Sequence, residues 1–251
     1  MGVKRPDEIE KIRGAGKVCK KILFEISSVL QAGKTTFEIA KFAELLMEKE
    51  KVKSAFLGYR GYPGVICISI NEEVVHGIPS KTRYLRNGDI VSLDVGVIKD
   101  GYIGDCAITC PVGEIDSEKK RLIEVTKKSL ELGISKVKAG CRTGDIGWEI
   151  QNFVEKEGFN VVRDFAGHGV GKYLHEEPDV PNFGHRGKGF ELKENMVIAI
   201  EPMVNMGKPD LKILADGWTV VTMDGLPSAH FEDTVLVKKE GFEVLTDISD
   251  E

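Results

Sequence analysis

The sequence contains no Cys-X-X-Cys pair, and its five cysteines are odd in number. This usage predicts free thiols in a reducing cytoplasm and argues against a disulfide framework or a zinc knuckle. No apolar run reaches the length of a signal or membrane segment, so the sequence predicts no membrane partner. No long basic run offsets the net charge of -5, which predicts no nucleic-acid partner.

The periodicity of apolar residues predicts an α+β protein. With 251 residues the chain is long enough to bury a full core, and we expect one domain over residues 1–251. Helical spacing and β-branched runs indicate where the elements lie. The predicted helices cover residues 7–30, 37–49, 117–137 and 144–157, and the clearest strands cover 65–70 and 90–98.

An internal repeat runs through the chain. Residues 32–39 are echoed by residues 139–146 without a gap, and each copy opens a helix. The same offset of 107 positions places Asp94 over Glu201, and each is the single acid of an apolar strand. We therefore predict two similar halves whose acids face each other across a pseudo-twofold axis, with chance similarity of helix-strand units as the alternative. The predicted halves span about residues 7–112 and 115–246.

Acidic residues in buried surroundings point to a metal centre. Asp94 lies in the middle of the apolar strand 90–98, and Asp105 follows it after a glycine-rich turn. A buried carboxylate persists when it is paired, binds a metal or has a raised pKa, so two on one hairpin favour a cation between them. A turn aspartate and a strand-end aspartate of structural role are the alternative.

The second half adds further candidate ligands at strands and strand turns, namely His168, Glu201 and Glu232. Four carboxylates balance the charge of two divalent ions, whereas a single ion would be over-supplied. A set of oxygen ligands with one imidazole and no thiolate suits Mn, Fe or Co better than a structural zinc site.

These residues and their neighbours resemble the type I methionine aminopeptidases over nearly the whole chain. The matching segments, in the order of the family, are residues 58–63, 69–72, 76–79, 94–97, 101–105, 167–171, 175–178, 200–203, 216–219 and 231–232. Only 26 positions separate His175 from Glu201, which leaves no room for the helical insert of type II enzymes. The chain also lacks the long amino-terminal extension of some eukaryotic members.

The resemblance implies a fold and a metal centre. The fold is the pita-bread α+β fold, with two pseudo-symmetric halves around a central, largely antiparallel sheet. Two divalent metal ions, which the sequence does not identify among Co, Mn, Fe, Zn and Ni, would be held by five ligands. The implied ligands are Asp94, Asp105, His168, Glu201 and Glu232.

The resemblance also implies an activity. A hydroxide activated by the two ions would attack the first peptide bond and remove the initiator methionine from nascent chains whose second residue is small. Glu201 would transfer the proton, His175 would stabilise the carbonyl oxygen and His76 would contact the scissile amide nitrogen. The partners of the enzyme would be nascent polypeptide amino termini, and contact with the ribosome stays open. Cysteine usage predicts a cytoplasmic protein, and we expect a monomer because no extended amphipathic face is left over once the two halves are packed. The implied methionine pocket consists of Tyr59, Tyr62, Cys67 and Trp218.

Several positions depart from the family pattern. Leu174 stands where a phenylalanine or another large residue is expected, and Phe56 where a smaller one is common. Asp233 replaces the usual histidine after the last ligand, and its place on a strand predicts that it points away from Glu232. The remaining histidines, His185 and His230, are interpreted as structural.

Two other functions share much of this pattern. A proline-specific aminopeptidase or dipeptidase has the same five ligands, although such enzymes usually carry an additional amino-terminal domain. A catalytically inactive relative that binds peptides or proteins would have lost ligands, whereas all five and both site histidines are present here.

Overall fold

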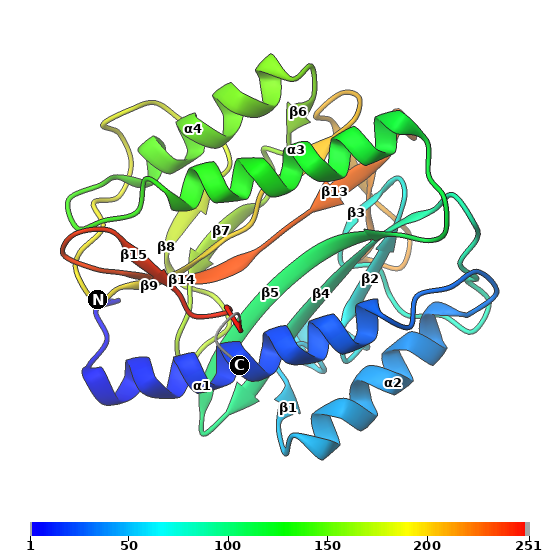
Figure 1. Ribbon diagram of the computed structural model, residues 1–251, viewed down its shortest axis with the longest axis horizontal. Coiled ribbons are helices and arrows are strands. Elements are labelled where there is room, and N and C mark those ends of the chain that lie inside the picture. The colour runs from blue at the N-terminus through cyan, green and yellow to red at the C-terminus, as the bar shows by residue number, and fades with distance from the viewer. Residues whose placement is uncertain (1, 249–251) are drawn as a thin grey trace.

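Helices and strands follow one another in two similar runs along the chain. The structure, a computed structural model, describes residues 2–248 (Figure 1). The helices are α1 (Pro6–Ser27), α2 (Thr36–Lys49), α3 (Ser117–Ile134) and α4 (Thr143–Lys156), with a short 3-10 helix at Tyr59–Gly61. The strands are β1 (Lys53–Ser54), β2 (Cys67–Ile70), β3 (Glu73–Val75), β4 (Ile90–Lys99), β5 (Tyr102–Pro111), β6 (Asn160–Val161), β7 (Ala166–Gly169), β8 (Glu176–Pro181), β9 (Val197–Ile200), β10 (Met203–Asn205), β11 (Leu211–Ile213), β12 (Val220–Thr222), β13 (Ser228–His230), β14 (Asp233–Val237) and β15 (Phe242–Val244). The predicted α+β class is confirmed.

The predicted repeat appears as the same hydrogen bonds at a constant spacing. The amide of Gly33 donates to the carbonyl of Leu85, and 107 positions later Gly140 donates to Leu192, both at 2.8 Å. The first helix of each half also ends in the same way. Val137 donates to Ile134 as Leu30 donates to Ser27, each over three residues. Such 3-10 bonds tighten the last turn, and therefore α1 and α3 end three residues before the apolar periodicity does.

The four longer helices cover one face of the sheets (Figure 1). Helix α1 packs along the β4-β5 hairpin, and α3 packs with α4 over the second half. Two glycines permit the close approach of α1. A side chain at Gly104 would lie 2.5 Å from the backbone of Ala15, and one at Gly16 would lie 2.4 Å from the carbonyl oxygen of Leu245. Gly16 therefore weakens the helix locally but lets it pack on β5 and the C-terminal segment.

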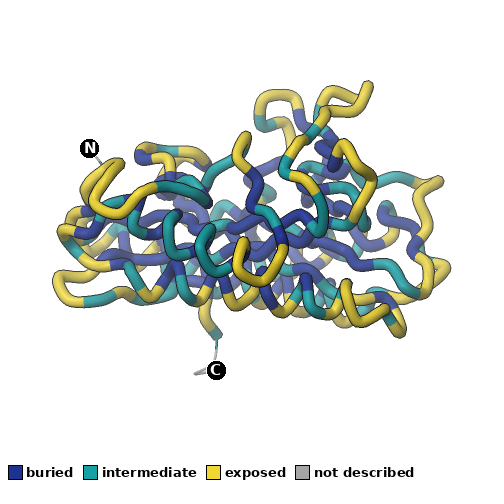
Figure 2. The backbone as a smooth tube through the Cα atoms, turned by 90° about the horizontal axis from the view of Figure 1, so that it is seen from above, coloured by how far each residue is buried: buried dark blue, intermediate teal, exposed yellow. Residues whose placement is uncertain are grey.

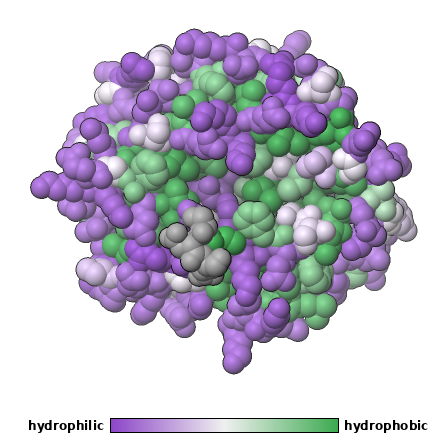
Figure 3. All heavy atoms as spheres, viewed as in Figure 1, coloured by the Kyte–Doolittle hydropathy of each residue, from purple (hydrophilic) through white to green (hydrophobic). Residues whose placement is uncertain are grey.

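Each half has its own apolar core beneath its helices. Ile22 and Leu93 belong to the core of the first half, and Leu122 and Ile146 to that of the second. Burial of each such side chain contributes about 1.5–3 kcal/mol to stability. Figure 2 shows the buried segments as a middle layer with exposed turns around it. On the face that carries the helices, hydrophobic side chains gather near the middle within a hydrophilic rim (Figure 3).

The sheets meet where the two halves join. Strands β1, β2 and β5 all pair with β4, while the second half contains the order β15-β14-β9-β7-β8. Ala107 on β5 pairs with Glu232, which lies between β13 and β14.

Within residues 2–248, no helix is both long and apolar enough to cross a membrane.

Candidate metal centre and substrate pocket

The first half contributes two carboxylates from one regular hairpin. In the β4-β5 ladder Asp94 lies opposite Ala107, and Asp105 lies opposite Gly96. Directly paired residues share a face, so Asp94 and Asp105 are diagonal neighbours on the same side of the sheet. Cys67 of β2 is paired with Asp94 on its other side. The hairpin thus presents both acids towards the junction with the second half.

The second half contributes its polar side chains from interruptions in its strands. His168 lies at a register shift of β7 between Gly167 and Gly169. Glu201 follows the last residue of β9 and precedes Pro202, while Glu232 lies between β13 and β14. Irregular positions of this kind turn a side chain away from the direction that the strand would give it.

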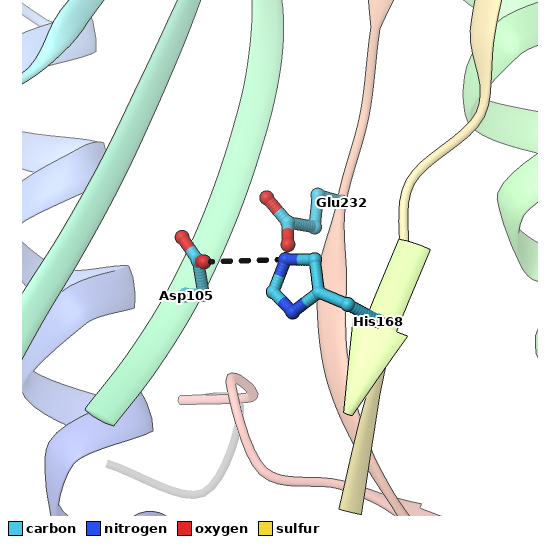
Figure 4. Close-up of side chains that lie close together, drawn as sticks. All are labelled: Asp105, His168 and Glu232. Atoms are coloured by element: carbon cyan, nitrogen blue, oxygen red, sulfur yellow. Dashed lines mark ion pairs between the residues drawn. The ribbon is translucent and has the colours of Figure 1, made fainter. Parts of the chain in front are cut away.

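These side chains converge on one point. Asp105, His168 and Glu232 each offer a ligand atom within 4.8 Å of the others, and Figure 4 shows them pointing towards one another from different elements. His168 Nε2 lies 3.9 Å from Asp105 Oδ2 and 3.6 Å from Glu201 Oε1. Asp94 lines the same cavity as these four residues. All five predicted ligands are therefore brought together.

The electrostatics of the cluster suit the binding of cations. Burial, reinforced by repulsion from neighbouring carboxylates, raises the pKa of Asp105, Glu201 and Glu232 well above the ordinary values. Burial also raises the pKa of Asp94 to about 7 and lowers that of His168 to about 3. A neutral imidazole and four acids form a suitable donor set for divalent ions, which would offset the repulsion.

Unpaired oxygens in the cluster support the same conclusion. Asp94 Oδ1, Asp105 Oδ1 and Glu232 Oε1 are buried and have no hydrogen-bond partner among residues 2–248. A buried acceptor without a partner destabilises the folded state by about 1–3 kcal/mol, and more if it is charged. Three such oxygens lie in one cluster. Their missing partners are consistent with a site in which metal ions bind these oxygens.

The two histidines predicted to act on the substrate flank the cluster. The ring centroid of His175 lies 4.2 Å from that of His168, and His175 Nδ1 is 2.7 Å from the Tyr59 hydroxyl. His76 has φ of 61° and packs edge-on against Phe165. Partial burial lowers the pKa of His175, and burial lowers that of His76 to about 4. Both rings are therefore neutral hydrogen-bonding groups at neutral pH.

The cluster lines a cavity of about 370 Å³, whose wall also includes aromatic and aliphatic side chains. All four residues predicted for the methionine pocket line it, as do Leu174 and Phe56. Tyr62 and Trp218 meet edge to face with their ring centroids 5.1 Å apart. The Tyr62 hydroxyl donates to the Gly77 carbonyl at 2.9 Å, which fixes its ring at the cavity wall.

His230 is a cavity residue that the sequence analysis interpreted as structural. It is 2% exposed, and its Nε2 lies 3.7 Å from Glu201 Oε2. Its closeness in sequence to Glu232 did not indicate this, because Glu232 lies outside β13 and β14 and strand alternation does not fix the direction of its side chain. His185, in contrast, is not among the residues that line the cavity.

Asp233 points away from the cluster, as predicted from strand alternation. Its Oδ1 accepts hydrogen bonds from Lys20 Nζ at 2.7 Å and from the Thr246 hydroxyl at 2.8 Å. The replacement of histidine by aspartate therefore joins β14 to helix α1 and places no extra group in the cavity.

Comparison with known proteins gives a consistent picture. Residues 10–239 match the model of metallopeptidase family M24. The chain is 47% identical to a methionine aminopeptidase of Clostridium acetobutylicum, covering 97% of this chain and 98% of that protein. It is 46% identical to methionine aminopeptidase 1 of Bacillus subtilis, covering 97% and 98% of the two chains.

Solved structures agree on the fold. The crystal structure of a methionine aminopeptidase from Thermotoga maritima superimposes with a TM-score of 0.96 at 47% identity, covering 98% of this chain and 99% of that one. The prolidase from Pyrococcus horikoshii has a TM-score of 0.79 at 24% identity, and the match covers all of this chain but 65% of the prolidase. The latter likeness concerns the fold alone, and together they confirm the pita-bread architecture.

Proposed function

Because the chain belongs to the methionine aminopeptidases of metallopeptidase family M24, we propose that it removes the amino-terminal methionine from polypeptides whose second residue is small. The observation that carries this proposal is the cluster of four acids and a histidine, which lines the same cavity as aromatic and aliphatic side chains. A buried acidic cluster and an adjoining apolar wall are the two features that metal-dependent removal of methionine requires.

The proposed metal ligands are the five residues of the cluster. Asp94 and Asp105 would hold divalent ions from the first half, and His168, Glu201 and Glu232 from the second. When bound, such ions lower the pKa of water towards neutrality and polarise a carbonyl oxygen.

The remaining chemistry belongs to side chains around the cluster. Glu201 is the proposed proton carrier, since it is the ligand that faces both His168 and His230. His175 lies next to His168 and would donate a hydrogen bond to the carbonyl oxygen as charge develops there. His76 would contact the amide nitrogen of the scissile bond. Its ring is suited to hydrogen bonding because burial, with a smaller effect from His175, lowers its pKa and keeps it neutral.

The proposed methionine pocket combines aromatic edges with a soft atom. Tyr59, Tyr62 and Trp218 supply the aromatic surface, and Cys67 supplies a sulfur near Asp94. Thioethers pack favourably on such surfaces, with the sulfur about 5 Å from a ring. Leu174 is 5% exposed and offers a smaller and more flexible wall than an aromatic ring.

We further propose that the enzyme acts as a cytoplasmic monomer on chains that emerge from the ribosome. Five free cysteines are consistent with a reducing compartment. Sedimentation of the purified chain at micromolar concentration and co-sedimentation with ribosomes would test the two parts separately.

The decisive experiment is hydrolysis by the metal-stripped protein after Mn(II), Co(II), Fe(II) or Zn(II) is added back. Release of methionine from Met-Ala-Ser, with far slower release from Met-Phe-Ser, is the expected result. Cleavage of an Ala-Pro peptide instead would indicate the proline-specific activity. Silence with all four metals and all three peptides would favour the inactive, peptide-binding alternative.

A further inference from the structure

Beside the cluster of candidate ligands, a very short ladder adds to the pairing of β3 with β12 in joining the two halves. Ala107 and Glu232 exchange two backbone hydrogen bonds, at 3.3 and 3.0 Å. In a regular antiparallel pair, the residues two positions further along in each direction would form the next backbone-bonded pairs. Those pairs are Asp105 with Thr234 and Thr109 with His230.

In both pairs the threonine hydroxyl makes the two hydrogen bonds that the threonine backbone would make in a regular ladder. The amide of Asp105 donates to Thr234 Oγ1 at 3.3 Å, and the Thr234 hydroxyl donates to the Asp105 carbonyl at 2.8 Å. On the other side, the amide of His230 donates to Thr109 Oγ1 at 2.8 Å, and the Thr109 hydroxyl donates to the His230 carbonyl at 2.9 Å. One hydroxyl therefore serves a donor and an acceptor of the opposite strand.

The two arrangements are related by the local twofold symmetry of an antiparallel pair. Exchange of the two strands carries the Asp105–Thr234 pair onto the His230–Thr109 pair, while the Ala107–Glu232 pair maps onto itself. Each threonine thus holds the backbone of a residue that the other half directs into the cavity. A side chain reaches further than the backbone, so the strands spread apart on both sides of the central pair without losing register.

Both hydroxyls are fixed in place. Thr234 is 0% exposed and Thr109 is 3% exposed, and β-branched side chains have few rotamers. Thr109 Oγ1 is 2.8 Å from Ser92 Oγ, whose hydroxyl donates because the Thr109 proton is used on His230. The amide of Thr234 donates to Thr246 Oγ1 at 3.1 Å.

We propose that Thr109 and Thr234 are positioning residues that set the separation of the two halves at the metal cluster, and thereby its affinity for divalent ions. The proposal rests on the proposed metal-dependent function. Thr234 acts on the ligand Asp105 directly, whereas Thr109 acts through His230 and the strand that leads to Glu232. Loss of the Thr234 hydroxyl should therefore weaken metal binding more than loss of the Thr109 hydroxyl.

The test is the dissociation constant of Mn(II), measured by calorimetry on the metal-stripped full chain. Thr234→Val should weaken binding about 10- to 100-fold, the range found for groups that orient metal ligands. Thr234→Ser keeps the hydroxyl and should stay within about 3-fold of the unchanged protein, a factor worth less than one hydrogen bond. Thr109→Val should give a smaller loss than Thr234→Val, which Thr109→Ser should restore.

A matched control separates positioning from stability. Thr126 is also 0% exposed, its hydroxyl donates to the Leu122 carbonyl at 2.7 Å within α3, and it is not among the residues that line the cavity. Thr126→Val should change the melting temperature without changing the Mn(II) affinity. If Thr234→Val does not fold, the Mn(II) affinities of Thr109→Val and Thr109→Ser are compared instead.

Two results would overturn the proposal. One is Mn(II) affinity in both valine variants within 2-fold of the unchanged protein, with only the melting temperature lowered. The other is an equal loss in the valine and serine variants, which would assign the effect to packing of the methyl group. Hydrolysis of Met-Ala-Ser by the unchanged protein tests the proposed function independently, because the inference is judged on ratios of metal affinity.

Discussion

The two halves build their parts of the site in different ways. The first half presents Asp94 and Asp105 from an uninterrupted hairpin in which ten consecutive residue pairs keep register. The second half presents His168 from a register shift and Glu201 and Glu232 from gaps between strands. A regular ladder fixes side chains by alternation alone, whereas a gap or bulge lets each side chain be aimed separately.

This difference assigns distinct tasks to the halves. The regular hairpin is a rigid base that supplies two carboxylates at a fixed spacing. The irregular half adds the imidazole, the proposed proton carrier Glu201 and the cavity residue His230 around that base. The two halves share an architecture but contribute different polar side chains to the cluster. Substitutions in matched pairs, one in each half, can test whether activity requires both halves.

The largest effect is expected when one ligand is removed from either half. Asp105→Asn and Glu232→Gln preserve size and remove one charge each. Each should lower kcat/KM for Met-Ala-Ser by about a thousandfold, equivalent to about 4 kcal/mol, because the proposed ions would be held by residues of both halves. Kinetics at several Mn(II) concentrations would measure this loss. A large loss for the first variant with nearly full activity for the second would mean that the hairpin alone suffices.

The two substrate-facing histidines provide a second matched pair. His175→Ala should lower kcat about 100-fold with little change in KM, since its hydrogen bond strengthens as charge develops on the carbonyl oxygen. His76→Ala should also lower kcat if it contacts the scissile amide. Steady-state kinetics on Met-Ala-Ser would separate kcat from KM. A rise in KM alone for His175→Ala would reduce its role to substrate binding.

Removal of the metal should make Asp94 a source of instability that depends on pH. The pKa of Asp94 is about 7 in the fold, against an ordinary value of 3.8, so the folded metal-free state binds more protons between these values. Stability from this group is therefore present below about pH 4 and is lost as the pH rises through about 7.

Comparison with Asp94→Asn isolates this contribution. Without metal, the variant should match the unchanged protein near pH 4 and exceed its free energy of unfolding by on the order of 1–3 kcal/mol at pH 7.5. Excess Mn(II) should reverse the order at pH 7.5. Urea denaturation at the two pH values measures both effects, and a pH-independent difference would argue against a protonated Asp94.

The smallest effect concerns the contact between the halves behind the site. Asp233→Asn removes the ion pair with Lys20 but can keep the hydrogen bond from Thr246. The loss in unfolding free energy should be about 1–2 kcal/mol, because the pair is largely shielded from water. Activity should stay within about threefold, a difference of less than 1 kcal/mol. Glu131→Gln, which breaks the exposed pair with Lys128, should cost less than about 0.5 kcal/mol and is the control.

Much of the first half was predictable from local pattern. The capping residues Thr35 and Glu38 open α2 as predicted, and β4 begins at Ile90 as its β-branched run indicates. Helix ends were less accurate because 3-10 turns continue the same apolar spacing. The place of His230 in the cavity could not be predicted, because its distance from Glu201 depends on two strands that meet only in the fold.

The sequence by itself determined the α+β class, the repeat at 107 positions and the identity of the four acids and one imidazole that converge. Each of these depends on local periodicity or on short sequence motifs that occur in a fixed order along the chain. Only the tertiary structure decided that Thr109 and Thr234 bridge the halves, that Asp233 reaches Lys20 and that His230 lines the cavity. These contacts join residues more than 100 positions apart, or strands of different sheets, and their distances arise from packing that no local pattern encodes.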